Sequence, residues 1–91
     1  MDQTIWKYNV KIDDVQKVQM PMASKLLSVQ VRHGMVAIWA MVNPEQQMVL
    51  RTIQMAGTGH DMSDRIMGDF LGTFQIENGA LVFHVFDGGE E

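Results

Sequence analysis

Residues 57–60, GTGH, have the residue types that best suit binding of a small anion. Glycines let a backbone approach a phosphate closely, and successive backbone amides can form a nest that holds an anion. In an oligomer, a basic residue of another subunit can complete the site, and the His60 ring can stack on a base or donate to a phosphate. The candidate ligand-binding residues are therefore Gly57, Thr58, Gly59, His60, Arg51 and Arg65.

The same stretch also suits a turn that leads into a short helix. Asp61 can accept hydrogen bonds from backbone amides two or three residues later, and Asp64 adds a favourable negative charge in the first helical turn. Gly68 is a typical residue just beyond a helix end. We therefore expect one short helix near residues 61–67. Because GTGH falls far short of a full phosphate-loop motif, the ligand site and the turn remain two interpretations of residues 57–60.

Metal and catalytic sites have weaker support in the sequence. His60, Asp61 and Asp64 lie close together, and His33 or His84 could join them, but no familiar zinc-ligand spacing is present and the chain has no cysteine. No serine lies in the glycine-flanked motif of a nucleophile elbow. We therefore expect no metal, no cofactor and no catalytic residue. A small metal- or histidine-dependent hydrolase ranks below a non-enzymatic function.

Length and charge limit the domain organisation and the partners. The 91 residues allow one hydrophobic core, and we expect a single β-rich domain over residues 1–87 with a loose acidic tail over residues 88–91. The net charge is −4 and the seven Lys and Arg residues are scattered, which argues against binding of duplex nucleic acid. No apolar run approaches the ~20 residues of a membrane span, and the N-terminus has no signal-like core. We therefore expect a cytoplasmic location without membrane contact.

Apolar residues recur mostly with a period of two, which predicts strands. The expected strands cover residues 4–12, 15–20, 27–32, 35–42, 48–56, 68–76 and 80–86. The first two are expected to pair as a hairpin, and His33-Gly34 and Asn78-Gly79 suit tight hairpin turns. The pattern predicts an all-β fold of about seven antiparallel strands in a meander, curled into a small barrel or folded into a sandwich. The expected aromatic core consists of Trp6, Trp39, Phe70, Phe74 and Phe83.

Residues 35–42, MVAIWAMV, are apolar on both faces of the expected strand. Only one face can point into a single core, so the short helix or another subunit must cover the other face. The chain has nine methionines, a residue that adapts well to binding surfaces. In residues 80–86, His84 better suits a packed or interface position than a catalytic base. We therefore expect a homo-oligomer, with interface candidates Met35, Trp39, Met41 and His84.

Five segments carry a resemblance that covers nearly the whole chain. They are TIWKYNV (4–10), KLLSVQV (25–31), AIWAMVNP (37–44), GTGH (57–60) and GTFQIENGALVFHVF (72–86). The chain resembles an uncharacterised family of small proteins, about 90 residues long, from tailed phages and prophages. The resemblance implies a phage or prophage origin and a compact β-rich protein. It implies no catalytic residues, because the family has none established.

Phage accessory proteins of this size often act on the host, including by blocking its defence systems. The function expected from this analogy is a non-enzymatic phage accessory binding protein, for example a counter-defence factor. It would bind a host protein or sequester a small signalling nucleotide in the host cytoplasm. The alternative is a virion structural or assembly protein that acts only through protein–protein contacts.

Overall fold

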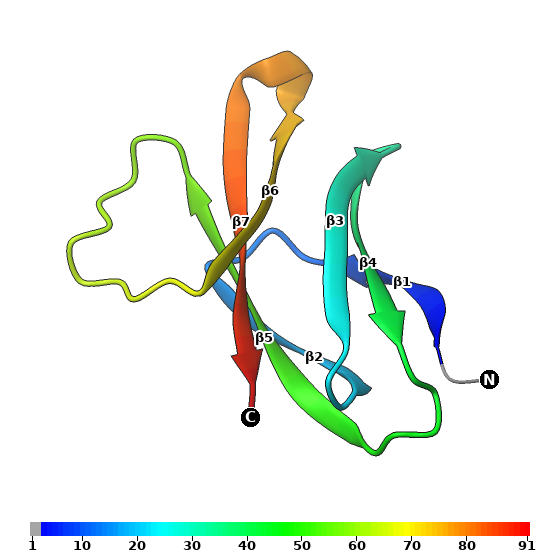
Figure 1. Ribbon diagram of the computed structural model, residues 1–91. Helices are drawn as coiled ribbons and strands as arrows, with labels where there is room; N and C mark the ends of the chain where they lie inside the picture. Colours follow the sequence, from blue (N-terminus) through cyan, green and yellow to red (C-terminus); the bar gives the residue numbers. More distant parts are fainter. Residues whose placement is uncertain (1–2) are drawn as a thin grey trace.

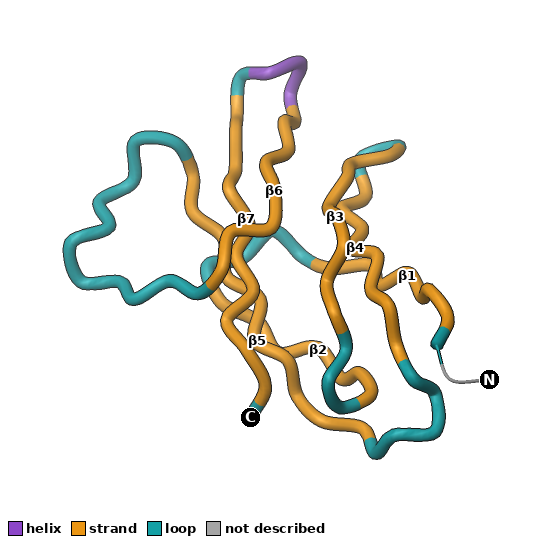
Figure 2. Tube along the Cα trace, viewed as in Figure 1, coloured by secondary structure: helices purple, strands orange, loops and turns teal. Residues whose placement is uncertain are grey.

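The computed structural model describes residues 3–91, which form seven antiparallel strands and one short 3₁₀ turn (Figures 1 and 2). The strands are β1 (Thr4–Val10), β2 (Val15–Pro21), β3 (Lys25–Arg32), β4 (Met35–Val42), β5 (Met48–Gly57), β6 (Asp69–Ile76) and β7 (Leu81–Glu90), and the 3₁₀ turn is η1 (Glu77–Gly79). The all-β prediction is confirmed. Within residues 3–91, no helix is long and apolar enough to cross a membrane.

The strands divide into a three-stranded sheet, in the order β1-β4-β3, and a four-stranded sheet, in the order β2-β5-β7-β6. The two sheets are not closed into a barrel, so the barrel alternative is wrong. The predicted hairpin of the first two strands is also wrong, because β1 pairs with β4 and β2 pairs with β5. Residues 11–14 instead carry the chain from one sheet to the other. The chain is therefore not a simple meander.

The two tight turns predicted from short dipeptides are confirmed as hairpin turns. His33 and Gly34 both have positive φ, 53° and 76°, and they join β3 to β4. Asn78 and Gly79 have φ of 54° and 89°, and they lie in η1 between the paired strands β6 and β7. Glycine and asparagine tolerate this left-handed region better than other residues. These local preferences locate the two hairpins in the sequence.

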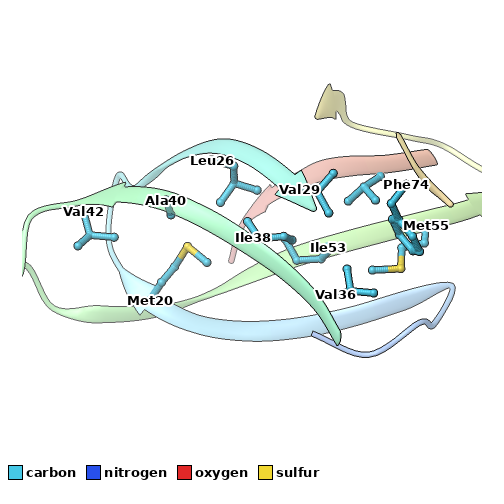
Figure 3. Close-up of a cluster of buried hydrophobic side chains, with 11 residues drawn as sticks. Met20, Leu26, Val29, Val36, Ile38, Ala40, Val42, Ile53, Met55 and Phe74 are labelled. Carbon is cyan, nitrogen blue, oxygen red and sulfur yellow. The ribbon is translucent and has the colours of Figure 1, made fainter. Parts of the chain in front are cut away.

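The core lies between the two sheets and is mainly aliphatic, with two methionines (Figure 3). From β4, alternate side chains point into it, and the inward residues are Val36, Ile38, Ala40 and Val42. Ile53, Met55 and Val85 meet them from the four-stranded sheet, and Met20 and Phe74 complete the two ends of the cluster in Figure 3. Unbranched methionine side chains fill irregular space of this kind.

The predicted aromatic core is only partly correct. Phe74 is buried, and Phe83 stacks on it with ring centroids 5.4 Å apart. Trp6, on the edge strand β1, is 37% exposed, and Phe70, near the start of the edge strand β6, is 61% exposed. Trp39 lies on the face of β4 opposite to Ile38, so it does not contribute to this core.

The helix predicted near residues 61–67 is wrong, because residues 58–68 form an irregular loop. The Asp61 carboxylate accepts from the Ser63 amide at 2.9 Å and from the Ser63 hydroxyl at 2.6 Å, which stabilises a local turn. The Gln54 side chain then donates to the Ile66 carbonyl and accepts from the Gly68 amide, at 2.9 and 2.8 Å. These bonds fix the loop to β5 in a non-helical shape. In Figure 1 the loop extends to the left, away from β1, β3 and β4.

The end of the chain, expected to be a loose acidic tail over residues 88–91, instead belongs to the sheet, because β7 continues to Glu90. Arg51, which is 5% exposed, forms ion pairs with Asp87 at 2.8 Å and Glu90 at 3.5 Å. It also donates to the Ser24 carbonyl. The Glu90 carboxylate accepts from the Ala23 amide at 2.6 Å. This Arg51 cluster fixes the C-terminal strand against the turn that connects β2 and β3.

We expect Arg51→Ala to lower the free energy of unfolding by about 3 kcal/mol, because it removes the cation from a buried ion-pair cluster. Arg32→Ala is the matched control, since Arg32 is exposed and its loss should change stability by less than about 0.5 kcal/mol. Urea unfolding followed by circular dichroism measures both. Equal stability of the two variants would contradict the structural role of Arg51.

Tyr8 has a buried hydroxyl for which residues 3–91 provide no hydrogen-bond partner, and burial raises the pKa of this phenol. We expect Tyr8→Phe to raise the free energy of unfolding by about 1 kcal/mol, because the cost of an unpaired buried polar group is removed. Because the pKa of Tyr8 is higher in the folded than in the unfolded protein, the unfolded state ionises first and the wild type loses stability as the pH rises above the pKa of the unfolded state. The advantage of Tyr8→Phe should therefore grow above about pH 10. A destabilised variant in urea titrations would show that the hydroxyl has a partner.

Candidate functional site

The GTGH stretch forms a turn at the end of β5 in which most backbone amides are already bonded. The Gly57 amide donates to His60 Nδ1 at 3.3 Å, and the His60 amide donates to the Gly57 carbonyl at 3.1 Å. The Thr58 amide donates to the Val82 carbonyl at 3.0 Å. Three of the four amides of residues 57–60 are thus engaged within the protein. An anion nest needs free amides that converge on one point, so this geometry favours the turn interpretation.

The charge beside this turn also opposes an anion. Hydrogen bonds from the Ser63 hydroxyl and then the Ser63 amide hold the pKa of Asp61 below its usual value. Asp61 therefore keeps its negative charge into mildly acidic solution, directly after His60. A phosphate at Gly57–His60 would lie near this carboxylate, and the one cation of residues 58–68, Arg65, is bonded to the Asp14 carbonyl.

The two arginines proposed for the ligand site are not placed beside it within one subunit. Arg51 lies six residues before Gly57 on β5, which is about 20 Å along a strand, and its guanidinium is buried in the Arg51 cluster. It could reach a ligand in another subunit only by breaking that cluster, so the geometry does not favour its assignment as a ligand residue. Arg65 is half-buried and donates to the Asp14 carbonyl at 3.1 Å, which fixes the loop against the turn before β2.

His84 lies on the outer face of the four-stranded sheet, between two threonine hydroxyls. Thr58 Oγ1 is 2.8 Å from its Nε2, and Thr73 Oγ1 is 3.0 Å from its Nδ1. A neutral imidazole donates from one nitrogen and accepts at the other, and a hydroxyl can play either part. Both ring nitrogens are therefore satisfied, and the arrangement joins β6, β7 and the start of the 58–68 loop. His84 is thus separated from the other interface candidates, which lie on the other sheet.

Met35, Trp39 and Met41 share the outer face of the three-stranded sheet. The register places Lys7 and Ser28 on either side of Trp39, and Ile5 and Lys25 on either side of Met41. Paired residues of neighbouring strands point to the same face. We call this surface the cationic face; its residues are Ile5, Lys7, Asn9, Lys25, Ser28, Gln30, Arg32, Met35, Ala37, Trp39 and Met41. The 58–68 loop, which stands in place of the predicted helix, does not cover this face (Figure 1).

The charge distribution of this surface differs from that of the whole chain. The protein has eleven Asp and Glu residues and a net charge of −4, yet β1, β3 and β4 contain no carboxylate. Three of the seven cations, Lys7, Lys25 and Arg32, lie on the cationic face. Two of its apolar residues, Ile5 and Met35, are 55% and 54% exposed, and Trp39 and Met41 are half-buried. This face therefore combines an apolar floor with positive charge.

Two hollows lie on the same side of the three-stranded sheet. The first, of about 330 Å³, is at the hairpin end and is lined by Lys7, Asn9, Arg32, His33, Met35, Ala37 and Trp39. The second, of about 450 Å³, is at the opposite end of β4 and is lined by Gln3, Thr4, Ile5 and Met41. Neither lining contains a carboxylate. The first lining contains two cations, Lys7 and Arg32, and the second is uncharged, so apolar groups of a partner match both hollows and its negative charge matches the first.

The sequence patterns pointed to Met35, Trp39 and Met41 but missed the lysines and the arginine around them. Their association depends on the pairing of β1 with β4, which joins residues 26 to 38 positions apart. One signal was available in the sequence: the expected strands over residues 4–12, 27–32 and 35–42 all lack Asp and Glu. In the described residues 3–91, no group of three or more His, Cys, Asp or Glu side chains could hold a metal ion.

The comparison with known families gives a match over the whole length. A family described as a domain of unknown function (DUF7352) matches residues 1–91. No curated protein and no solved structure matches the chain. The family description attaches no role to any residue, so the assignment of the working surface depends on the geometry above.

We expect phosphate to affect wild-type protein and His60→Ala equally, because the GTGH turn has few free amides for an anion. His60→Ala by itself should cost less than about 1 kcal/mol, the value of one exposed hydrogen bond. Phosphate stabilises many proteins by exclusion from their surface, so the decisive quantity is the difference between the two variants in melting temperature as phosphate is added. A rise in melting temperature with phosphate that is confined to the wild type would support an anion site at GTGH.

Proposed function

The chain belongs to the DUF7352 family, whose description assigns no activity, and we propose that it is a non-enzymatic binding protein whose cationic face docks on an acidic surface of a partner protein. The observation that carries the proposal is the concentration of Trp39, Met35, Met41 and three cations on a sheet face free of carboxylates.

The composition of the cationic face supports a protein partner. Tryptophan, methionine and arginine are enriched in protein–protein interfaces, and buried aromatic residues at the centre supply most of the binding energy. Trp39 lies on the central strand of the sheet, with Lys7 directly beside it. Cations around an apolar centre increase the rate of encounter with an acidic partner and select against basic ones.

A second copy of the chain is a poor partner for this surface. A symmetric dimer through the cationic face would place the same patch of both copies together. Lys7, Lys25 and Arg32 of each copy would then lie opposite the same cations, with no carboxylate on either face to pair with them. Like charges that face one another are unfavourable. The homo-oligomer expected from the sequence remains a prediction, and the cationic face does not favour it.

The biological setting we propose follows the sequence resemblance rather than the geometry. We propose that the protein is a phage or prophage accessory factor in the host cytoplasm that binds a host protein, with counter-defence as one such role. Sequestration of a small nucleotide at GTGH loses support, because the turn is internally bonded and Arg51 is buried.

Charge reversal on the cationic face is the test of the proposed function. We expect Lys7→Glu combined with Arg32→Glu to weaken binding of the partner at least about tenfold, since two attractive charges become repulsive. The matched control is Lys11→Glu, in the exposed segment between β1 and β2. Quantitative affinity capture from bacterial lysate compares the three proteins. The supporting result is one protein held by wild type and Lys11→Glu, lost by the double variant and released by salt.

Two results would contradict the proposal. The first is equal capture of that protein by the double variant and the wild type, which would show that another surface binds it. The second is recovery of the wild type and the double variant in equal amounts from purified virions. That result would favour the alternative of a virion structural or assembly protein that does not use the cationic face.

A further inference from the structure

The two hollows of the cationic face follow one another along β4, where Met35, Ala37 and Trp39 line the first, with Ala37 in the middle, and Met41 lines the second. Ala37 lies in the first hollow and Met41 in the second. A strand rises roughly 3.3 Å per residue, so these positions are about 13 Å apart. An isolated small anion would occupy one hollow and leave the other empty. A chain in extended conformation covers the same distance in about four residues.

The charges lie between and beside the hollows. Lys7 is paired with Trp39, between Ala37 and Met41 along the sheet, while Lys25 is paired with Met41 and Arg32 with Met35. Cations therefore lie along the whole length of the face and do not converge on a single point. This distribution matches negative charges repeated along a chain, and it matches a single phosphate less well.

We infer that the cationic face binds an extended acidic segment of the partner, with one bulky apolar side chain in each hollow. The two anchors are four residues apart, which places them on the same side of an extended chain because its side chains alternate. A carboxylate between the anchors, on the same side, faces Lys7, and a carboxylate beyond the first anchor faces Arg32. Lys25, paired with Met41, lies beside the second anchor and adjacent to a carboxylate that follows it. This inference depends on the proposed function, since it specifies the partner segment that the same face recognises.

A blocked peptide of sequence ESFSESFSE tests this arrangement, since its odd-numbered side chains all point to one side when it is extended. The probe is Trp39 fluorescence in a Trp6→Phe variant of the full chain, because Trp6 and Trp39 are the only tryptophans. We expect ESFSESFSE to bind at least about tenfold more tightly than ESASESASE, because both phenyl groups are buried in the complex. It should also bind more tightly than KSFSKSFSK, which has the wrong charge, and than ESFSFSESE, in which the anchors are two residues apart.

The outcomes separate this inference from the proposed function. Equal affinity for ESFSESFSE and ESFSFSESE would overturn the four-residue spacing, and equal affinity for ESFSESFSE and ESASESASE would overturn the anchors. If capture of the partner still depends on Lys7 and Arg32 in either case, the proposed function stands. A larger change of Trp39 fluorescence with adenosine monophosphate than with ESFSESFSE would assign the first hollow to a nucleotide and overturn the inference. Lys7→Glu should weaken ESFSESFSE binding, whereas Lys11→Glu should not.

Discussion

The register of β4 is the constraint on which the rest of the structure depends. This strand is apolar on both faces, and its pairing with β1 and β3 decides which face enters the core. Ile38 points inward and Trp39 outward, and a slip of one residue would exchange the two sets of side chains. A bulge between Leu26 and Ser28 on β3 contributes to this register, since Leu26 and Val29 are both buried although three positions apart. The open apolar face is therefore a direct consequence of how the core is filled.

The Arg51 cluster fixes the other sheet. Arg51 shares the inward face of β5 with Ile53 and Met55, so a charged group lies at the end of an otherwise apolar core. Burial of a charge is costly unless it is paired, and here two acidic residues of β7 and a backbone carbonyl provide the pairing. Asp87 and Glu90, near the acidic end of the chain, thus stabilise the fold by pairing with Arg51. The cations of the cationic face have no such partners on their own strands.

The sequence predicts the local features of this protein well and the non-local ones poorly. Strands such as 35–42 and turns such as His33-Gly34 follow from alternation and backbone preference, which act between neighbouring residues. The pairing of β1 with β4 depends on how the whole chain divides into two sheets. No local sequence pattern distinguishes this pairing from a β1–β2 hairpin. The helix expected near residues 61–67 does not form, because side chains of Gln54 and Asp61 bond the loop backbone in a non-helical arrangement.

The same division applies to the candidate site. Met35, Trp39 and Met41 could be grouped from the sequence because alternate residues of one strand point to the same face. Lys7 and Lys25 could be placed beside them only once the pairing of β1 and β3 with β4 was known. Arg51 was assigned to a ligand because another subunit could bring this cation to the GTGH stretch. Its burial could not be predicted without knowing that Asp87 and Glu90 lie beside it.

The most direct test of the central claim, that the cationic face is open and available in the free protein, is acrylamide quenching of Trp39 in the Trp6→Phe variant across a range of protein concentrations. The account predicts that Trp39 is accessible to the quencher at every concentration, because neither the 58–68 loop nor a second copy covers the face. Strong protection at all concentrations would show that another part of the chain covers Trp39. Protection that grows with concentration would show a second copy on the face, and either result would contradict the account.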